Sequence, residues 1–140
     1  MTSRSIGYAR TSGGGDNRQA SGLEVQVKAL KDAGCAAVFQ EIVSTRTAEK
    51  DRSQLQAALN AVVEGDELVI TALSRLGRTQ REVINRLHDL QEKRIHVRTL
   101  DGLVNTKAMG KMAPVLIGLL TGLNEVEREM TRDRVLESIE

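Results

Sequence analysis

Two spacings of apolar residues alternate along the chain. Short apolar runs predict β-strands at residues 5–10, 37–42, 67–73 and 95–100. Between these runs apolar residues recur at helical spacing, which predicts helices from about residue 23 to 34, at 53–63 and at 79–93. The segments 13–22 and 44–52 are polar and are expected to form loops. Because strands and helices alternate, we expect an α/β fold with a largely parallel central sheet flanked by helices.

The last part of the chain follows a different pattern. From about Lys107 to Glu140 the sequence predicts one long helix, interrupted only by Pro114, which should kink the helix or mark its first turn. A continuous apolar seam runs along it: Met109, Met112, Leu116, Leu119, Leu123, Val126 and Met130. Such a helix is too long to be covered by one small sheet. We therefore divide the chain into an α/β core, residues 1–105, and a long C-terminal helix, residues 106–140, of the same domain.

Composition limits the classes of partner. The 140 residues carry a net charge of only +1, so binding to a polyanion must come from local clusters of arginine. Aromatic residues make up 1% of the chain, which counts against binding single strands by base stacking. Cys35 is the one cysteine, so no internal disulfide can form, and no apolar run approaches membrane-spanning length. A soluble cytoplasmic protein is expected.

Candidate chemistry first occurs where the first strand ends, in the stretch GYARTS at residues 7–12. Side chains alternate along a strand, so Tyr8 and Arg10 share a face, and Ser12 joins them if the chain stays extended. Ligands of parallel α/β sheets bind at the carboxyl ends of the strands. The stretch thus places a phenol, a guanidinium and a hydroxyl where a site is expected. An ordinary strand end with a capping serine accounts for the same residues equally well.

A second candidate follows the third strand, in LSRLGRT at residues 73–79. Arg75 and Arg78 are three residues apart, so they share a face if a helix begins there. A helix N-terminus attracts anions, whereas positive charges there oppose the helix dipole. We interpret the two arginines as a phosphate site in preference to a solvated helix start.

Other polar residues give weaker signals. Considered singly, four of them are most simply interpreted as solvated surface residues: Glu41, Arg52, Glu127 and Arg128. His88 and His96 lie on separate predicted elements without ligand spacing, so no metal site is expected. The three glycines at residues 13–15 are not followed by Gly-Lys-Ser/Thr and do not predict a phosphate-binding loop. No cofactor is expected.

Taken together, these pieces resemble the catalytic domain of the small serine recombinases, the resolvase/invertase family. The matching stretches are GYARTS (7–12), LEVQ (23–26), DR (51–52), LSRLGR (73–78), MGKM (109–112) and ER (127–128). They cover essentially the whole chain in the family's order. The resemblance implies a site-specific DNA recombinase that forms a 5′-phosphoseryl intermediate, exchanges strands in a tetramer and religates them.

The resemblance also implies roles for single residues. Ser12 would be the nucleophile. The guanidiniums that hold the scissile phosphate would be those of Arg10, Arg52, Arg75 and Arg78. Supporting positions would be those of Tyr8, Gln26, Glu41, Glu127 and Arg128. The long helix would form the interface of a homodimer and lie across double-stranded DNA. Whether the parent protein resolves, inverts or integrates stays open.

Some features depart from the family's pattern. Ser74 stands where many members carry Asp, and Glu41 stands where Asp is frequent. The 13–22 loop is expected to be longer than in compact resolvases. The chain ends at Glu140, inside the long helix, so we expect the helix-turn-helix domain that reads the DNA site to be absent.

Two other functions stay open. The chain could be a dimerisation module whose catalysis is vestigial. It could also be a small phosphatase-like α/β hydrolase that uses Ser12 or Cys35 on phosphoesters, although no phosphate-binding loop surrounds Cys35.

Overall fold

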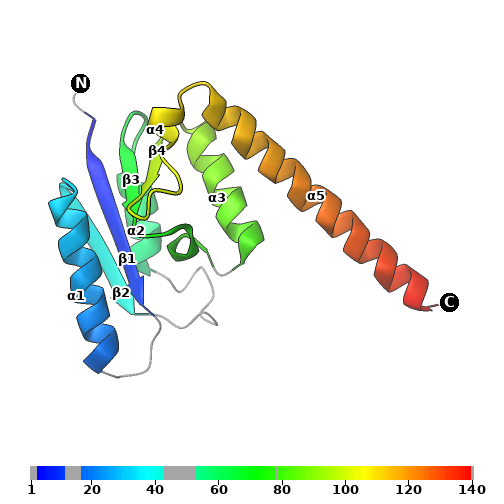
Figure 1. Cartoon of the computed structure of the whole chain (residues 1–140), viewed down its shortest axis with the longest axis horizontal. Helices are drawn as coiled ribbons and strands as arrows, with labels where there is room; N and C mark the ends of the chain where they lie inside the picture. The colour runs from blue at the N-terminus through cyan, green and yellow to red at the C-terminus, as the bar shows by residue number, and fades with distance from the viewer. Residues whose placement is uncertain (1–2, 12–16, 43–52, 78, 140) are drawn as a thin grey trace.

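The computed structural model describes residues 3–11, 17–42, 53–77 and 79–139, which form a parallel sheet with helices on both faces and one long helix that leaves the body (Figure 1). The strands lie in the order β2-β1-β3-β4 and are β1 (Ser5–Thr11), β2 (Ala37–Ile42), β3 (Glu67–Ile70) and β4 (His96–Thr99). The helices are α1 (Asn17–Asp32), α2 (Ser53–Ala61), α3 (Gln80–Glu92), α4 (Thr106–Met109) and α5 (Met112–Ile139). The predicted fold class is confirmed.

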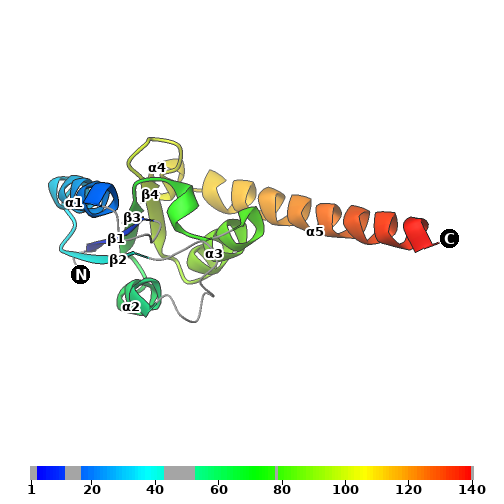
Figure 2. The same cartoon turned by 90° about the horizontal axis from the view of Figure 1, so that it is seen from below.

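Alternation of side chains along β1 separates two apolar layers. Ile6 and Tyr8 point into the larger cluster, where they pack with side chains of α2 and α3. Ala9 belongs to a smaller cluster on the other face, to which α1 contributes. Figure 2 shows α1 and α2 on opposite sides of the sheet. Arg10 follows Tyr8 on the same face, so the fold directs Arg10 toward the side of α2 and α3.

The third apolar run gives a shorter strand than predicted. β3 ends at Ile70, and the chain then makes a single 3₁₀ turn, Leu73–Arg75 (η2). This turn is closed by the Arg75 N–H, which donates to the Ala72 carbonyl at 3.1 Å. An apolar run predicts burial and leaves the backbone conformation undetermined; Leu73 packs against the larger cluster from the turn.

Helix α3 begins five residues after Arg75. Thr79 is its N-cap, and the Thr79 Oγ1 accepts a hydrogen bond from the Glu82 N–H at 3.2 Å. Arg75 therefore lies on η2, outside the first turn of α3. The expectation that Arg75 and Arg78 sit at the N-terminus of this helix is therefore wrong for Arg75, and Arg78 lies outside the described residues.

Helix α1 begins earlier than predicted. It starts at Asn17, so most of the predicted 13–22 loop is helical, and residues 12–16 lie outside the described part of the chain. Residues 17–22, NRQASG, hold no apolar side chain larger than Ala, so the sequence showed no helical period there. Arg, Gln and Ala are nevertheless good helix formers.

The C-terminal segment contains two helices where the sequence predicted one. Between α4 and α5 lies Gly110, whose φ of +58° is a left-handed conformation that suits glycine and ends α4. Pro114 then lies in the first turn of α5, where no intrahelical partner is needed for a backbone N–H. Of the two outcomes expected for Pro114, a kink or the first turn of the helix, the structure has the first turn.

Helix α5 has 28 residues and is about 42 Å long at 1.5 Å per residue. Its first half packs on α3, with Ile117 in the larger apolar cluster and Leu120 beside side chains of α3, and its second half projects beyond the body in both views (Figures 1 and 2). Seven large apolar side chains of α5 are between 41% and 61% exposed, and we call them the exposed face of α5: Met112, Val115, Leu116, Leu119, Leu123, Val126 and Met130. In the described ranges, no helix combines the length and hydropathy that crossing a membrane requires.

Candidate active site

Arg10, on β1, carries a buried guanidinium. The residue is 4% exposed, and its Nη2 donates to the Ser74 carbonyl of η2 at 2.7 Å. Its Nε is also buried and has no hydrogen-bond partner among the residues that the structure describes. Desolvation by burial lowers the pKa of Arg10, and the nearby charge of Arg75 adds to this, while Tyr8 and Glu41 oppose it. Arginine stays charged at neutral pH, so Arg10 is a buried cation whose Nε–H can still donate a hydrogen bond to a ligand.

Arg75, on η2, lies near enough to Arg10 for the two positive charges to repel each other. Its Nε is likewise buried without a hydrogen-bond partner in the described part of the chain. A buried donor that lacks a partner costs about 1–3 kcal/mol, and two like charges held close together repel each other. An anion that accepts from both guanidiniums removes both penalties. Arg10 and Arg75 therefore form a candidate anion site beyond the carboxyl ends of β1 and β3.

Gln26, on α1, fixes the backbone of Arg10. Its Nε2 donates to the Arg10 carbonyl at 3.1 Å, and its Oε1 accepts from the Arg10 N–H at 3.2 Å. These are the two bonds that a neighbouring strand would make with that residue. The structure thus gives Gln26 a physical role: it holds the end of β1 immediately before residues 12–16.

Glu41, at the carboxyl end of β2, links three elements. Its carboxylate accepts from the Leu55 N–H at 3.0 Å and the Gln54 N–H at 3.3 Å, which are free donors in the first turn of α2. It also accepts from the hydroxyl of Tyr8 on β1. A carboxylate at a helix N-terminus is favoured by the helix dipole. Glu41 therefore holds α2, which begins directly after Arg52, against β1.

Three predicted residues lie outside the described part of the chain: Ser12, Arg52 and Arg78. Their placement in the site stays a prediction. The described residues that adjoin them in the sequence are Thr11, Ser53, Gly77 and Thr79.

Glu127 and Arg128 lie apart from the arginine pair in this single chain. Both are on the half of α5 that projects beyond the body (Figures 1 and 2). Arg128 makes an ion pair with Glu125 on the same helix at 3.5 Å, and both side chains are exposed. The structure therefore brings Tyr8, Arg10 and Arg75 together and does not bring Glu127 and Arg128 to them.

Cys35 does not have the chemistry of a nucleophile. Desolvation by burial raises the pKa of its thiol to about 11, so it is a thiol at neutral pH. Its Sγ would lie 3.1 Å from a Cβ at Gly7, so the side chain fills space between the sheet and the end of α1. This counts against a hydrolase that uses Cys35.

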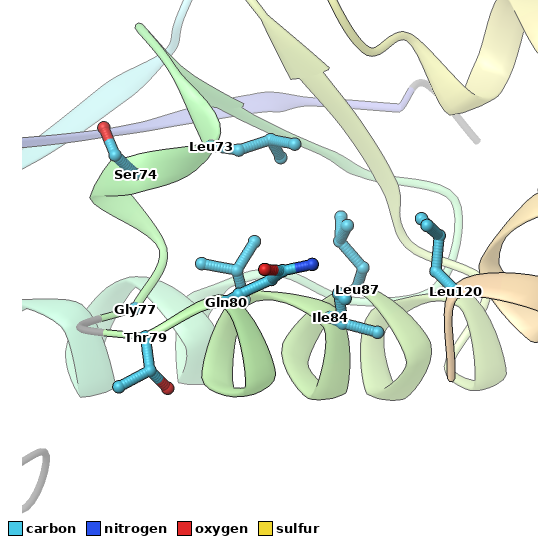
Figure 3. Close-up of a pocket in the computed structure, with 9 residues that line it drawn as sticks. Leu73, Ser74, Gly77, Thr79, Gln80, Ile84, Leu87 and Leu120 are labelled. Carbon is cyan, nitrogen blue, oxygen red and sulfur yellow. The ribbon is translucent and has the colours of Figure 1, made fainter. Parts of the chain in front are cut away.

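An apolar groove of about 400 Å³ lies next to η2 (Figure 3). Leu73 contributes from η2, Ile84 and Leu87 from α3, and Leu120 from α5. The groove is open to solvent in this single chain and lies alongside α5.

Sequence reasoning overlooked one buried charge on α3. Arg86 is 7% exposed, although charged residues on helices are usually solvated. The available signal was its spacing, since position 86 is three residues after Val83 and four before Leu90, both apolar.

Comparison with known proteins places the chain in a family. The family model described as "Resolvase, N terminal domain" matches residues 5–140. The chain is 35% identical over 136 residues to the serine recombinase gin of Escherichia phage Mu, covering 96% of this chain and 65% of that protein. It is 32% identical over 135 residues to the DNA-invertase hin of Salmonella typhimurium, covering 96% of this chain and 66% of that protein. The chain thus spans slightly less than two thirds of the length of these relatives.

The fold has counterparts among solved structures. The N-terminal catalytic domain of TP901-1 integrase superposes with a TM-score of 0.68 at 17% identity, over 91% of this chain and 98% of that one. A resolvase family site-specific recombinase from Streptococcus pneumoniae gives a TM-score of 0.66 at 16% identity, over 99% of this chain and 96% of that one. At these identities the likeness concerns the fold.

Proposed function

The chain belongs to the family of resolvase N-terminal domains, and we propose that it is the catalytic part of a site-specific recombinase that cuts and rejoins double-stranded DNA. The observation that carries the proposal is the arginine pair. Arg10 and Arg75 are two guanidiniums from distant parts of the chain, each with a buried Nε that no described residue satisfies. A phosphodiester supplies the acceptors and the charge that this pair lacks.

Ser12, two residues beyond Arg10, is the proposed nucleophile. Its Oγ forms a bond to the phosphorus as the bond from phosphorus to the 3′ oxygen breaks. The serine loses its proton and the leaving oxygen gains one, which gives a 5′-phosphoserine and a free 3′-hydroxyl. The reverse step, with a new 3′-hydroxyl, rejoins the strand. Because the phosphoester stores the bond energy, the cycle needs no nucleotide.

Arginines supply the electrostatic part of the proposed mechanism. Negative charge grows on the phosphoryl oxygens in the transition state, and preorganised donors that face it are worth roughly 3 kcal/mol each. Arg10 is buried, and of the partly exposed Arg75 the Nε is buried, a setting in which such donors act strongly. Arg52 and Arg78 are the proposed further members of the cluster. Tyr8, Gln26 and Glu41 hold the two segments from which Arg10 and Arg52 come.

We also propose that two copies of the chain form a homodimer through residues 106–140, while residues 1–105 form the catalytic core. The exposed face of α5 supports this, because a row of half-exposed apolar side chains on a projecting helix favours burial against a partner. The apolar groove beside η2, which Leu120 of α5 helps to line, adds apolar surface next to this helix. In the proposed complex two dimers pair on DNA, and Glu127 and Arg128 act from α5 in that assembly.

Covalent trapping tests the proposal. The full-length protein is incubated with supercoiled DNA that carries paired candidate sites, and protein–DNA adducts are counted after denaturation. We expect Ser12→Ala to abolish the adduct. Ser74→Ala is the matched control, because Ser74 is an exposed serine in the adjoining turn whose backbone carbonyl, not its hydroxyl, contacts Arg10. Adducts that persist in Ser12→Ala would exclude Ser12 as the nucleophile, and their absence from wild type and control alike would leave the dimerisation module as the better account.

A further inference from the structure

Arg86 is a buried charge that the proposed mechanism does not use. It lies on α3 and is 7% exposed, beside the apolar side chains that α3 buries. A guanidinium in an apolar environment carries a desolvation cost unless hydrogen bonds offset it. The Arg86 Nη1 donates to the Leu76 carbonyl at 2.9 Å, in a buried hydrogen bond that spans ten positions of the chain.

The bonded carbonyl belongs to the segment that carries Arg75. Leu76 directly follows Arg75, is fully buried, and closes η2 with its N–H on the Leu73 carbonyl at 2.9 Å. On the other side of Arg75, the Ser74 carbonyl accepts from Arg10 at 2.7 Å. Two guanidiniums thus bind the carbonyls that flank Arg75, one from β1 and one from α3.

The packing after η2 leaves little freedom for an alternative arrangement. Gly77 lies so close to α3 that a Cβ there would be 2.7 Å from the Glu82 Cβ and 3.0 Å from the Val83 nitrogen. The segment after η2 therefore packs on the first turn of α3, and Arg86, in the second turn of α3, holds the same segment through its hydrogen bond to the Leu76 carbonyl. Loss of the Arg86 bond would leave the buried Leu76 carbonyl without this partner, and any shift of the Leu76 peptide that relieves the loss would displace the neighbouring Arg75.

We infer that Arg86 is a positioning residue: through the Leu76 carbonyl it holds η2 so that the Arg75 guanidinium faces the phosphate site. The inference rests on the proposed function for its catalytic consequence, and on the structure alone for its geometric one. A misplacement of about 1 Å in a catalytic group can reduce a rate about 100-fold. Arg86 does not contact the phosphate in this account, so its loss should affect the chemical step more than DNA binding.

Arg86→Met is the test variant, because Met keeps an unbranched apolar stem and removes the donor. Arg98→Met is its matched control. Arg98 also donates to a backbone carbonyl, that of Ala33 at 3.2 Å, and pairs with Glu67 at 3.2 Å, at the amino end of the sheet away from η2. Melting temperatures of both variants show whether the stability losses are comparable.

Two readouts are measured. The first is the rate of adduct formation at saturating DNA with the full-length protein. We expect Arg86→Met to slow it by about 100-fold with DNA affinity within about twofold of wild type, and Arg98→Met to stay within about twofold in both. Equal rate losses in the two variants, or an unchanged rate in Arg86→Met, would overturn the inference.

The second readout does not need recombinase activity. It is the Nε–Hε resonance of Arg75 in ¹⁵N NMR spectra of this chain, with and without inorganic phosphate. We expect Arg86→Met to shift this resonance and weaken phosphate binding, and Arg98→Met to do neither. If wild type forms no adduct, the proposed function fails while this readout still decides the inference: an unshifted Arg75 resonance would refute it. If Arg86→Met does not fold, Arg86→Gln and Arg98→Gln, which shorten the side chain and remove the guanidinium, are compared in the same way.

Discussion

Replacement of Glu41 by Ala should destabilise the protein well beyond the usual effect of removing a partly buried carboxylate. The side chain accepts from the N–H groups of Gln54 and Leu55 and from the Tyr8 hydroxyl. Loss of a helix N-cap costs about 1 kcal/mol, and loss of a hydrogen bond to a charged acceptor costs about 1.5–3 kcal/mol. We expect Glu41→Ala to lower the free energy of unfolding by about 2–4 kcal/mol and the melting temperature by about 10 °C.

The assay is urea denaturation followed by far-UV circular dichroism. Glu92→Ala is the control, since the Glu92 side chain is 71% exposed and should change stability by less than about 0.5 kcal/mol. In a double-mutant cycle with Tyr8→Phe we expect a coupling energy of about 1 kcal/mol or more, because the two side chains share a hydrogen bond. A Glu41→Ala protein as stable as Glu92→Ala would refute the idea that this carboxylate holds α2 to β1.

Three other expectations concern packing, assembly and pH. Gly77→Ala should cost about 1–3 kcal/mol, because the new Cβ would lie 2.7 Å from that of Glu82, whereas Gly118→Ala has open space; equal stabilities on denaturation would contradict the packing. Burial of Leu119, which is 61% exposed in the single chain, should stabilise a symmetric dimer by about 1–2 kcal/mol per copy. Leu119→Ala should therefore raise the dimer Kd about 30- to 700-fold, measured by sedimentation equilibrium, and an unchanged Kd would show that the exposed face of α5 is not the dimer interface. Hydrogen bonds from Arg4 and Val63 outweigh desolvation and hold the pKa of Asp66 below its ordinary value. The stabilisation from Asp66 is therefore fully present above about pH 4, the unfolded pKa, and is lost as pH falls through the lower folded pKa. The stability gap to Asp66→Asn should narrow steadily on acidification below about pH 4, and a gap that is unchanged on acidification would contradict it.

The sequence predicted those elements whose apolar residues have a clear period. β2 was predicted with its observed bounds, and α3 to within a residue at each end. The start of α1 was missed because residues 17–22 lack large apolar side chains. The break at Gly110 was missed because a glycine among helix formers does not reveal its φ; only the packed structure fixes the left-handed value.

The sequence predicted which residues belong to the candidate site, but it did not predict the hydrogen bonds that join them. Alternation along β1 placed Tyr8 and Arg10 on one face, and the resemblance to serine recombinases supplied Gln26 and Glu41. Their hydrogen bonds join residues 13 to 64 positions apart, which local patterns do not encode. Arg86 was overlooked because a charged helical residue is ordinarily solvated, and only its tertiary contact with the Leu76 carbonyl distinguishes it.

The most direct test is to identify the residue that becomes covalently joined to the DNA phosphate. Adducts from the full-length protein and supercoiled DNA are digested with nuclease and protease, and the peptide that retains a phosphate is sequenced by mass spectrometry. We predict a single phosphorylated residue, Ser12, whose yield falls sharply in Arg10→Ala and Arg75→Ala. Phosphate on Tyr8 or on any other side chain, or a yield on Ser12 that is indifferent to both arginines, would contradict the account.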